Sequence, residues 1–559
     1  MGTLSGILST GHQALLAQQT ALQVAGQNIA NVNTPGYARE RAALTSAPSS
    51  STHVLRSGVS VDGITRAYDR FITAQVNVAS SNHQSTQTQT DLLGQIESLF
   101  NDLNTPEAGL SGTLSKLFDD FHALAQEPQG LVGRNVLLQQ GDAVTDALHQ
   151  LTTGLQGVRQ QSNGALGDAV ADVNSLTTQL AALNVQIQQS EVDPSTNANT
   201  LRDQQDVLLK QLAENISVTS FTTDSSQLTV LLGGGRPVVE GNQAFNLATR
   251  IDPDDGQRLL VDLQDAQGNG TDVTASIRSG RIHGLLEVRD TVLPSLNANV
   301  DRLAAQLTSN VNQLHSAGYG LDGTTGQGFF VPRQVTGQAL AANTGGGALQ
   351  SIDVFDPTQL TLDDYRLSFA SPALPPTFDI VNATTGATVA SGQNYAAGAT
   401  FRFAGVAVTL ADNGTTPQPG DTFLIRTTRD AARNIAVDPV LLTHPRQVAA
   451  AQTPNPGDNA NALALAQLQE AQTIDGSTFG AFYHTVITSV GVQSQQASQL
   501  AEQQHTVLSG LENRREALSG VSLDEEQIDL IRFQQAYNAA AQVIRIADEL
   551  GRTVLDLIR

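Results

Sequence analysis

Apolar residues recur every seven positions at both ends of the chain. The N-terminal repeat consists of Leu8, Leu15, Leu22 and Ile29. The C-terminal repeat consists of Leu523, Leu530, Tyr537 and Ile544, with Phe533 and Ala540 on the companion seam. A seven-residue apolar repeat predicts a helix that buries one stripe against another helix. We therefore expect the two ends to pair as a coiled coil. The predicted assembly interface comprises Leu8, Leu15, Leu22, Ile29, Leu530, Phe533, Tyr537, Ala540 and Ile544.

Between these repeats the pattern changes twice from helical to strand-like. Helical periodicity predicts helices over residues 67–103, 111–126, 130–160, 162–190, 199–214 and 291–316, and a long coil over 482–518. Short apolar runs separated by turn residues predict strands over 216–289 and 337–430. The predicted fold class is α+β and multidomain. Its terminal helices pair in a coiled-coil stem, and two inserted, mainly-β domains project outward.

This pattern divides the chain into four parts. Residues 1–42 and 520–559 form a terminal helical coiled-coil domain. Residues 43–215, 286–336 and 431–519 form a helical stem domain. Residues 216–285 form the first β domain, and residues 337–430 form the outer β domain.

A turn signature follows the N-terminal helix. Its residues are Asn31, Asn33, Thr34, Pro35, Gly36 and Tyr37. Proline disfavours a helical conformation at Thr34, and Pro-Gly fits the centre of a type II turn. The last helix begins near Ser522, where Ser522 and Glu525 fit a capping box. The acidic run Asp524 to Glu526 therefore reads as a helix cap.

Composition narrows the function classes. The 559 residues carry a net charge of −23, so a nucleic-acid partner is not expected. The chain has no cysteine, which excludes disulfides and thiolate chemistry. No apolar run is long enough to span a bilayer, so membrane insertion is not expected either. The first positive residue is Arg39, which does not fit the basic start of a secretory signal peptide. Either a cytoplasmic protein or export by another signal fits these observations.

No constellation of catalytic residues, cofactor ligands or metal ligands stands out. Gly233 to Pro237 lacks the phosphate-loop pattern and reads as a hairpin turn. Asp252, Asp254 and Asp255 lack the remaining ligands of a calcium loop and read as a solvated turn. We expect no enzyme activity and no cofactor.

Several segments resemble one family. Ala30 to Tyr37, after an Ala- and Gln-rich helix, resembles the N-terminal signature of bacterial flagellar rod, hook and hook-associated proteins. Three parts of the tail, Ser519–Glu526, Leu530–Tyr537 and Ala547–Leu550, look like the hook-associated protein 1 family, which forms the hook–filament junction. Internal segments resemble the same family: Gly457-Asp458-Asn459, His315 to Tyr319, and Asn199 with Asp203 and Asp206. Gln205 departs from the family, which tends to have arginine there.

The resemblance implies a structural protein, exported through the flagellar type III apparatus to the extracellular hook–filament junction. It also implies four partners: further copies of the chain, the hook protein, hook-associated protein 3, and a cytoplasmic chaperone that holds the C-terminal helix. A hook or distal-rod protein is the alternative within this class. A secreted peptidoglycan-acting enzyme, or an adhesin with a coiled stem, is the alternative outside it.

Overall fold

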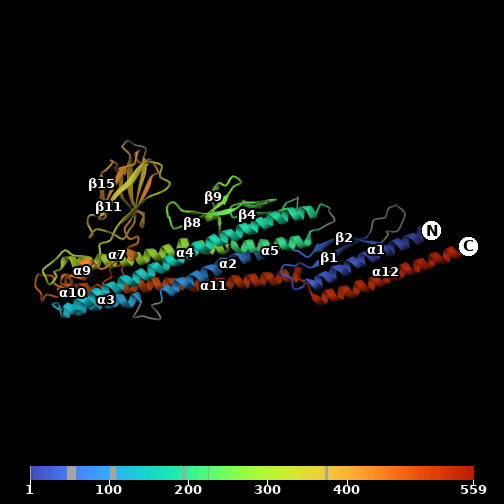
Figure 1. The fold of residues 1–559 in the computed structure, drawn as a ribbon, viewed down its shortest axis with the longest axis horizontal. Coiled ribbons are helices and arrows are strands. Elements are labelled where there is room, and N and C mark those ends of the chain that lie inside the picture. Colours follow the sequence, from blue (N-terminus) through green and yellow to red (C-terminus); the bar gives the residue numbers. More distant parts are fainter. Residues whose placement is uncertain are drawn as a thin grey trace.

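The molecule is elongated, and its two termini lie together at one end (Figure 1). The computed structural model describes residues 2–46, 58–100, 109–192, 197–223, 226–371 and 375–558. Helices α1 (Gly2–Ala30) and α12 (Leu523–Ile558) run side by side at this end. The predicted pairing of the terminal helices is therefore confirmed, and the mixed α+β architecture agrees with the predicted fold class.

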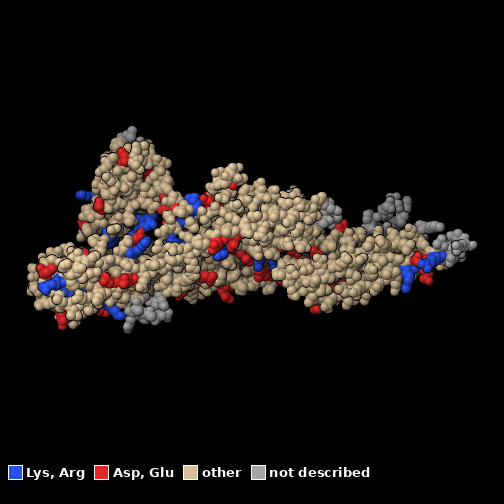
Figure 2. Space-filling model, in the orientation of Figure 1, with Lys and Arg blue, Asp and Glu red and all other residues tan. Residues whose placement is uncertain are grey.

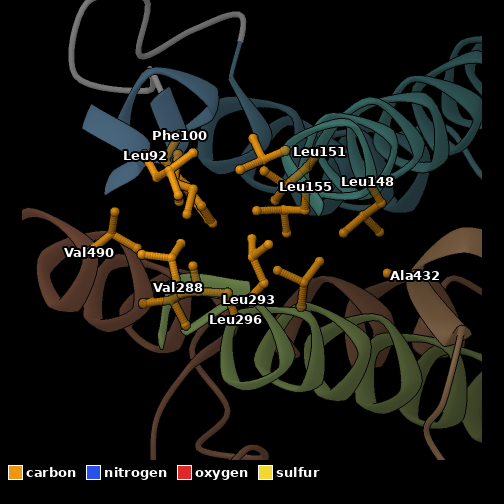
Figure 3. Close-up of a cluster of buried hydrophobic side chains, with 14 of the residues drawn as sticks. Leu92, Phe100, Leu148, Leu151, Leu155, Val288, Leu293, Leu296, Ala432 and Val490 are labelled. Atoms are coloured by element: carbon orange, nitrogen blue, oxygen red, sulfur yellow. The ribbon is translucent and has the colours of Figure 1, made fainter. Parts of the chain in front are cut away.

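Helices far apart in sequence assemble the stem. They are α2 (Arg70–Leu99), α3 (Leu110–Gln126), α4 (Leu131–Ser190), α5 (Asn199–Asn215), α6 (Gly280–Glu287), α7 (Leu293–Ala317), α8 (Ala431–Asn434), α9 (Pro439–Thr443), α10 (Ala460–Gln467) and α11 (Phe479–Ser519). A π-helical segment, Val288–Val292, joins α6 to α7. Figure 3 shows the apolar core where α2, α4, α7 and α11 meet, with Leu92, Leu155, Leu296 and Val490 directed into it.

Helix α4 is one continuous helix of 60 residues, and the predicted break between residues 160 and 162 is wrong. Ser162, Asn163 and Gly164 lie at this place in the sequence, and all three residue types favour turns over helix interiors. In the fold, Ser162 is fully buried and its hydroxyl donates to the Val158 carbonyl at 2.8 Å, inside the helix. Leu166 is fully buried in the core one turn later. Tertiary packing therefore outweighs the local preference of these residues.

The coil predicted over 482–518 has its apolar seam at Val486, Val490, Ala497, Leu500, Val507, Leu511 and Leu518, and α11 follows this seam only in its first half. Val486 and Val490 are buried as expected. Beyond Ala497 the buried side continues through Ala501 and Leu508, while other apolar residues predicted for the seam are exposed. These exposed residues are Leu500, Val507 and Leu518.

A two-stranded hairpin leads from the terminal pair into the stem. Strands β1 (Glu40–Ser46) and β2 (Val59–Arg66) pair antiparallel. The hairpin packs beside α1. The side-chain amide oxygen of Gln13 is buried near Gly58, so the hairpin covers this side of the helix.

The first β domain lies flat along the stem instead of projecting from it (Figure 1). One sheet has the order β3-β4-β5-β6 and the other β7-β8-β9. The strands are β3 (Val218–Thr222), β4 (Leu228–Leu232), β5 (Arg236–Glu240), β6 (Gln243–Ala244), β7 (Leu247–Ile251), β8 (Leu259–Gln264) and β9 (Gly270–Asp272). Asn184 and Asn174 of α4 hydrogen-bond to the backbone of Leu228 and Leu247. The strands share the core of the stem, so the expectation that this domain projects outward is wrong.

The outer β domain does project outward and has a core of its own (Figure 1). Its sheets have the orders β10-β17-β12-β13-β14 and β11-β16-β15. The strands are β10 (Thr336–Ala339), β11 (Gly347–Val354), β12 (Tyr365–Ser371), β13 (Thr377–Asn382), β14 (Thr388–Asn394), β15 (Thr400–Phe403), β16 (Val406–Asp412) and β17 (Thr422–Arg426). Alternating residues of β12, β13, β16 and β17 fill the space between the sheets, as expected for a sandwich.

Buried polar contacts close the far end of the stem. His315 is fully buried, with Nδ1 2.7 Å from the Gln327 carbonyl, while its Nε2 accepts from the Ala449 N–H at 2.9 Å. Asn461 donates to the Ala449 carbonyl at 2.7 Å. A Cβ on Gly318 would lie 2.3 Å from the Asn461 amide nitrogen, so only glycine fits. These contacts explain why particular residues are needed in the segment from His315 to Tyr319, which resembles the family in sequence.

The Gly457-Asp458-Asn459 segment is a side-chain-supported turn. Asp458 accepts hydrogen bonds from the N–H groups of Gln452, Thr453 and Ala460. These bonds lower the pKa of Asp458 to about 2. Asn459 donates to the Ala125 carbonyl at the end of α3. The segment therefore links α10 to α3.

Candidate assembly interface

The signature turn between α1 and the hairpin is a type II turn, as predicted. The Tyr37 N–H donates to the Thr34 carbonyl at 3.2 Å, and Gly36 has a φ of +81°. A Cβ on Gly36 would lie 2.3 Å from a methyl carbon of Val207 on α5. Glycine is therefore required for both its conformation and its lack of a side chain.

Of the remaining signature residues, Asn31 makes hydrogen bonds within the turn, whereas others are exposed. Asn31 accepts from the Thr34 hydroxyl at 3.1 Å and donates to the Gln27 carbonyl at 3.0 Å. Asn33 and Pro35 are exposed. The exposed side of the turn borders a groove of about 780 Å³, whose opposite wall is formed by α4 and α5.

Asn28 is the buried centre of this region, with 1% of its surface exposed. Its amide oxygen accepts from the Glu40 N–H at 3.0 Å and from the Tyr37 hydroxyl at 2.9 Å. Its amide nitrogen donates to the Glu40 carbonyl at 2.9 Å and to Glu526 Oε2 at 3.1 Å. Burial and the nearby carboxylates raise the pKa of Tyr37, so its phenol stays protonated and donates. Asn28 thus joins α1, the turn, β1 and α12.

Arg39 forms the second connection to α12. Its Nε donates to Glu526 Oε1 at 2.6 Å, and its Nη1 donates to Glu525. Arg39 is 6% exposed and Glu526 is 2% exposed, so this pair is held away from water. The Arg39 N–H also donates to the Ser519 carbonyl at 2.8 Å, where α11 ends. The start of α12 is therefore fixed by one arginine that immediately precedes β1.

This arrangement changes the interpretation of the acidic run at the start of α12. The sequence predicted a cap, and the position in the first turn does suit the helix dipole. Glu525, however, directs its carboxylate to Arg39, not to the capping position beside Ser522. The run is thus a tertiary contact as well as a helix start.

A third contact attaches the hairpin to the stem. Arg66 Nη1 lies 2.8 Å from Asp203 Oδ1 and 2.6 Å from Asp206 Oδ2 on α5. Asp203 also accepts from the Ala38 N–H at 3.1 Å. Asn199 donates to the Ile64 carbonyl at 3.0 Å. Gln205, the departure from the family pattern, is buried and donates to Asn184, so it belongs to the contact between α5 and α4.

The nine residues predicted as an interface lie on the two terminal helices. Leu8, Leu15, Leu22 and Ile29 are half-buried. Gly11 and Leu4 share their helix face and contact α12, since a Cβ on Gly11 would lie 2.6 Å from Ile544 and Gly551 lies against Leu4. On α12, Leu530, Phe533 and Ile544 are half-buried, Ala540 is buried and Tyr537 is 36% exposed. The contacts of Gly11 and Leu4 indicate that these residues form the seam between the two helices of one chain.

A second apolar stripe runs along α12 on its outer side. Six large aliphatic side chains are between 44% and 66% exposed: Ile528, Ile531, Val543, Ile546, Leu550 and Val554. Their spacing of three and four residues places them on one face, with Gln535 and Ala539 between Ile531 and Val543. Ile544 and Ile546 are about 200° apart around the helix, so the stripe lies opposite the seam.

The sequence did not reveal the polar network of Asn28, Arg39 and Glu526. Two signals pointed to it: Arg39 is the first charged residue of the chain, and the acidic run lies at the start of the last helix. Nothing local connects them, because the contact joins residues 487 positions apart.

The turns considered for ligands are structural. Gly234 and Gly235, with φ of +87° and +82°, form the predicted hairpin turn between β4 and β5. Asp252 is only 4% exposed and pairs with Arg258, so the expectation of a solvated turn is wrong there. Asp254 accepts from the Ala341 N–H at 2.7 Å and thereby contacts the outer β domain.

Within the described ranges, no three acidic or histidine side chains are grouped closely enough to hold a metal ion. No helix in those ranges has the length and apolar character needed to cross a membrane.

Comparison with known proteins agrees with this geometry. The helical domain family of flagellar hook-associated protein FlgK matches residues 93–330. The family described as flagella basal body rod protein matches residues 8–37, and the C-terminal family of flagellar basal body rod FlgEFG proteins matches residues 516–557. The two rod-protein matches thus cover α1 with its turn, and α12.

Relatives match along the whole chain. Flagellar hook-associated protein 1 of Salmonella typhimurium is 28% identical over 568 residues, covering 99% of this chain and 100% of the relative. The protein of the same name from Bacillus subtilis is 27% identical over 565 residues, covering 98% and 97%. The structure of the flagellar hook junction protein FlgK from Burkholderia pseudomallei has the same fold, with a TM-score of 0.68 and 21% identity over 80% of this chain and 100% of that one.

At both terminal helices the chain is similar to flagellar rod proteins, which are axial proteins of the flagellum. Along its whole length the chain is similar to flagellar hook-associated protein 1. The family resemblance read from the sequence is confirmed.

Proposed function

We propose that this chain is a structural subunit of the bacterial flagellum that joins the hook to the filament, outside the cell. The observation that carries the proposal is the pairing of the chain's two ends, which leaves an apolar stripe of α12 open to solvent. Exposed stripes of this kind mark protein–protein contacts. Full-length similarity to hook-associated protein 1 supports the same role.

Assembly then uses the two faces of α12 differently. The seam residues, including Phe533 and Ile544, hold α12 to α1. The outer stripe, including Ile531 and Ile546, packs against terminal helices of neighbouring copies. Such packing gives a continuous helical layer, because the stripe of each copy is covered by one neighbour while that copy covers the stripe of the next.

The partners follow from this position. The hook protein lies on one side of the junction and hook-associated protein 3 on the other. Before export through the flagellar type III pathway, a cytoplasmic chaperone holds the C-terminal helix. At that stage α1 does not cover the seam, so Leu530, Phe533, Tyr537, Ala540 and Ile544 are available to the chaperone. A chain with these roles needs no catalytic site.

Electron microscopy of a deletion strain tests the proposal. The expected result is hooks without filaments and filament subunits shed into the medium, with filaments restored by the intact gene. Normal filaments on the deletion strain would contradict it. Missing hooks would instead favour a hook or distal-rod role.

A further inference from the structure

A recess rich in arginine lies where the outer β domain meets the stem. Figure 2 shows basic side chains gathered at this place. The recess has a volume of about 270 Å³, and five arginines line it. We call it the arginine pocket, defined by Arg159, Arg289, Arg426, Arg429 and Arg433. In a chain with a net charge of −23, such a grouping of positive side chains needs a physical reason.

Two of the five arginines are neutralised by close carboxylates. Arg159 Nη2 lies 2.5 Å from Asp255 Oδ2, in the turn between β7 and β8. Arg289 is bound by Asp290 at 2.8 Å and donates to the Leu259 carbonyl at 2.7 Å. These two guanidinium groups form the stem side of the pocket, and their own partners hold them in place.

The arginines at the base of the outer β domain are less well balanced. The Nε of Arg426 is buried and has no hydrogen-bond partner among the described residues. Arg429 is 3.8 Å from Asp430, which is long for an ion pair. Arg433 is exposed at the rim. Burial and the neighbouring Arg429 lower the pKa of Arg426, although Asp364, Asp255 and Asp430 act in the opposite direction.

The other carboxylates of the pocket compensate only in part. Asp301 accepts from the N–H groups of Asp430 at 3.0 Å and Ala432 at 2.9 Å. Burial raises the pKa of Asp301 to about 7, so it is only partly charged near neutral pH. Asp364 accepts from the Thr427 N–H at 3.1 Å, and burial raises its pKa as well. Five arginines against four aspartates, one of them only partly charged, leave the pocket a small positive charge, and Arg426 Nε is a buried donor without an acceptor among the described residues.

We propose that the arginine pocket binds a phosphate-type oxyanion, either inorganic phosphate or the terminal phosphate of a small monoester. Planar guanidinium groups donate pairs of parallel hydrogen bonds to such oxygens. Donors that come from the stem and from the outer domain suit a tetrahedral ion, which accepts from several directions. A space of about 270 Å³ holds such an ion with a few waters but excludes a folded partner.

The position of the pocket gives the bound anion a mechanical role. Arg159 and Arg289 belong to the stem, whereas Arg426 ends the last strand of the outer β domain. An anion shared by both sides links them directly. Binding therefore fixes the angle of the outer domain on the stem.

Isothermal titration calorimetry of the full chain tests the proposal. Inorganic phosphate and glycerol phosphate are titrated separately, at constant ionic strength against chloride, with circular dichroism as the check on folding. We expect saturable binding at submillimolar to millimolar concentrations. The double variant Arg426→Gln/Arg429→Gln should bind at least tenfold more weakly. The control Arg366→Gln changes an exposed arginine of β12 and should bind like the parent chain.

The two ligands separate the two sources of phosphate. Binding of inorganic phosphate alone supports a free-ion site, and tighter binding of glycerol phosphate supports a monoester site. Absence of binding by the folded parent chain would overturn the proposal. So would equal binding by the double variant, or binding of an acidic peptide in place of both phosphates. Should the double variant unfold, Arg433→Gln replaces it, because its exposed side chain carries no core packing.

Discussion

Arg39 Nε lies 2.6 Å from Glu526 Oε1, although 487 positions separate the two residues along the chain. Both side chains are almost fully buried. The arginine precedes the hairpin and the glutamate lies in the first turn of the last helix, so the contact forms only after both chain ends have come together. Asn28 joins the same glutamate from α1. A polar cluster therefore fixes the terminal domain to the stem. Along the rest of the domain, the apolar seam holds α1 to α12.

Replacement of Arg39 by glutamine should loosen the start of α12. The substitution leaves Glu526 buried without its cation, which costs about 3–5 kcal/mol when a buried pair is broken. Hydrogen exchange of residues 523–530 should become much faster. The control is Arg532→Gln, whose side chain is 77% exposed and 3.8 Å from Asp529. Equal exchange in both variants would contradict the role of Arg39.

Replacement of Asn28 by aspartate should be more harmful than replacement by alanine. Aspartate would place a second carboxylate about 3 Å from Glu526 and would lose the donor to the Glu40 carbonyl. We expect the difference between the two variants in thermal unfolding to shrink as the pH falls toward 4, because protonation removes the repulsion. Asn538→Asp, at an exposed position of α12, is the control. A difference that does not change with pH would argue against this account.

The sequence predicted the pairing of the ends because the repeat of Leu8, Leu15 and Leu22 is periodic, and periodicity is a local property. It could not predict the partners of Asn28, since an asparagine inside a helix satisfies its amide with whatever the tertiary fold brings near. The continuity of α4 through Ser162 could not be predicted for the same reason, because the packing that buries Ser162 comes from other parts of the chain. The two β domains also look alike in sequence. Only contacts such as Asn184 with Leu228 separate the domain that lies on the stem from the one that projects.

The outer stripe of α12 should control filament growth without controlling the fold. Ile546→Glu places a charge on a side chain that is 54% exposed in the single chain but covered in the proposed assembly. We expect normal helix content in the purified protein and loss of filaments in the complemented deletion strain. Gln534→Glu introduces the same charge outside the stripe and should support normal filaments. Filaments of normal length with Ile546→Glu would contradict the proposed subunit contact.

Asp301 should make stability fall as the pH rises. Its pKa is about 7 in the folded chain and lower when unfolded, so the folded state binds more protons between about pH 4 and 7. Stability present at acidic pH is therefore lost as the pH rises through 7. Asp301→Asn carries no charge but keeps only one side-chain oxygen, so one of the N–H groups of Asp430 and Ala432, which donate to separate oxygens, loses its acceptor. That cost does not depend on pH, so the pH trend still reports the charge of Asp301. The free energy of unfolding of the variant minus that of the parent, measured with urea, should increase by about 2–4 kcal/mol between pH 4 and 8. Asp119→Asn, at an exposed position, should show no such trend.

His315 should make the stability of the fold fall as the pH decreases, which is the opposite of the effect of Asp301. Burial lowers its pKa to about 4, because the ring is fully enclosed and its Nε2 must stay unprotonated to accept from the Ala449 N–H. The unfolded chain binds the extra proton at about pH 6.5, so stability is lost as the pH falls from 6.5 to 4. The loss is on the order of 3 kcal/mol at about 1.4 kcal/mol per pKa unit. His315→Gln should be less stable at pH 7 but should show a shallower decline over this range in urea unfolding. His122→Gln, on the exposed side of α3, should keep the decline of the parent chain, and an unchanged slope in His315→Gln would contradict the assignment.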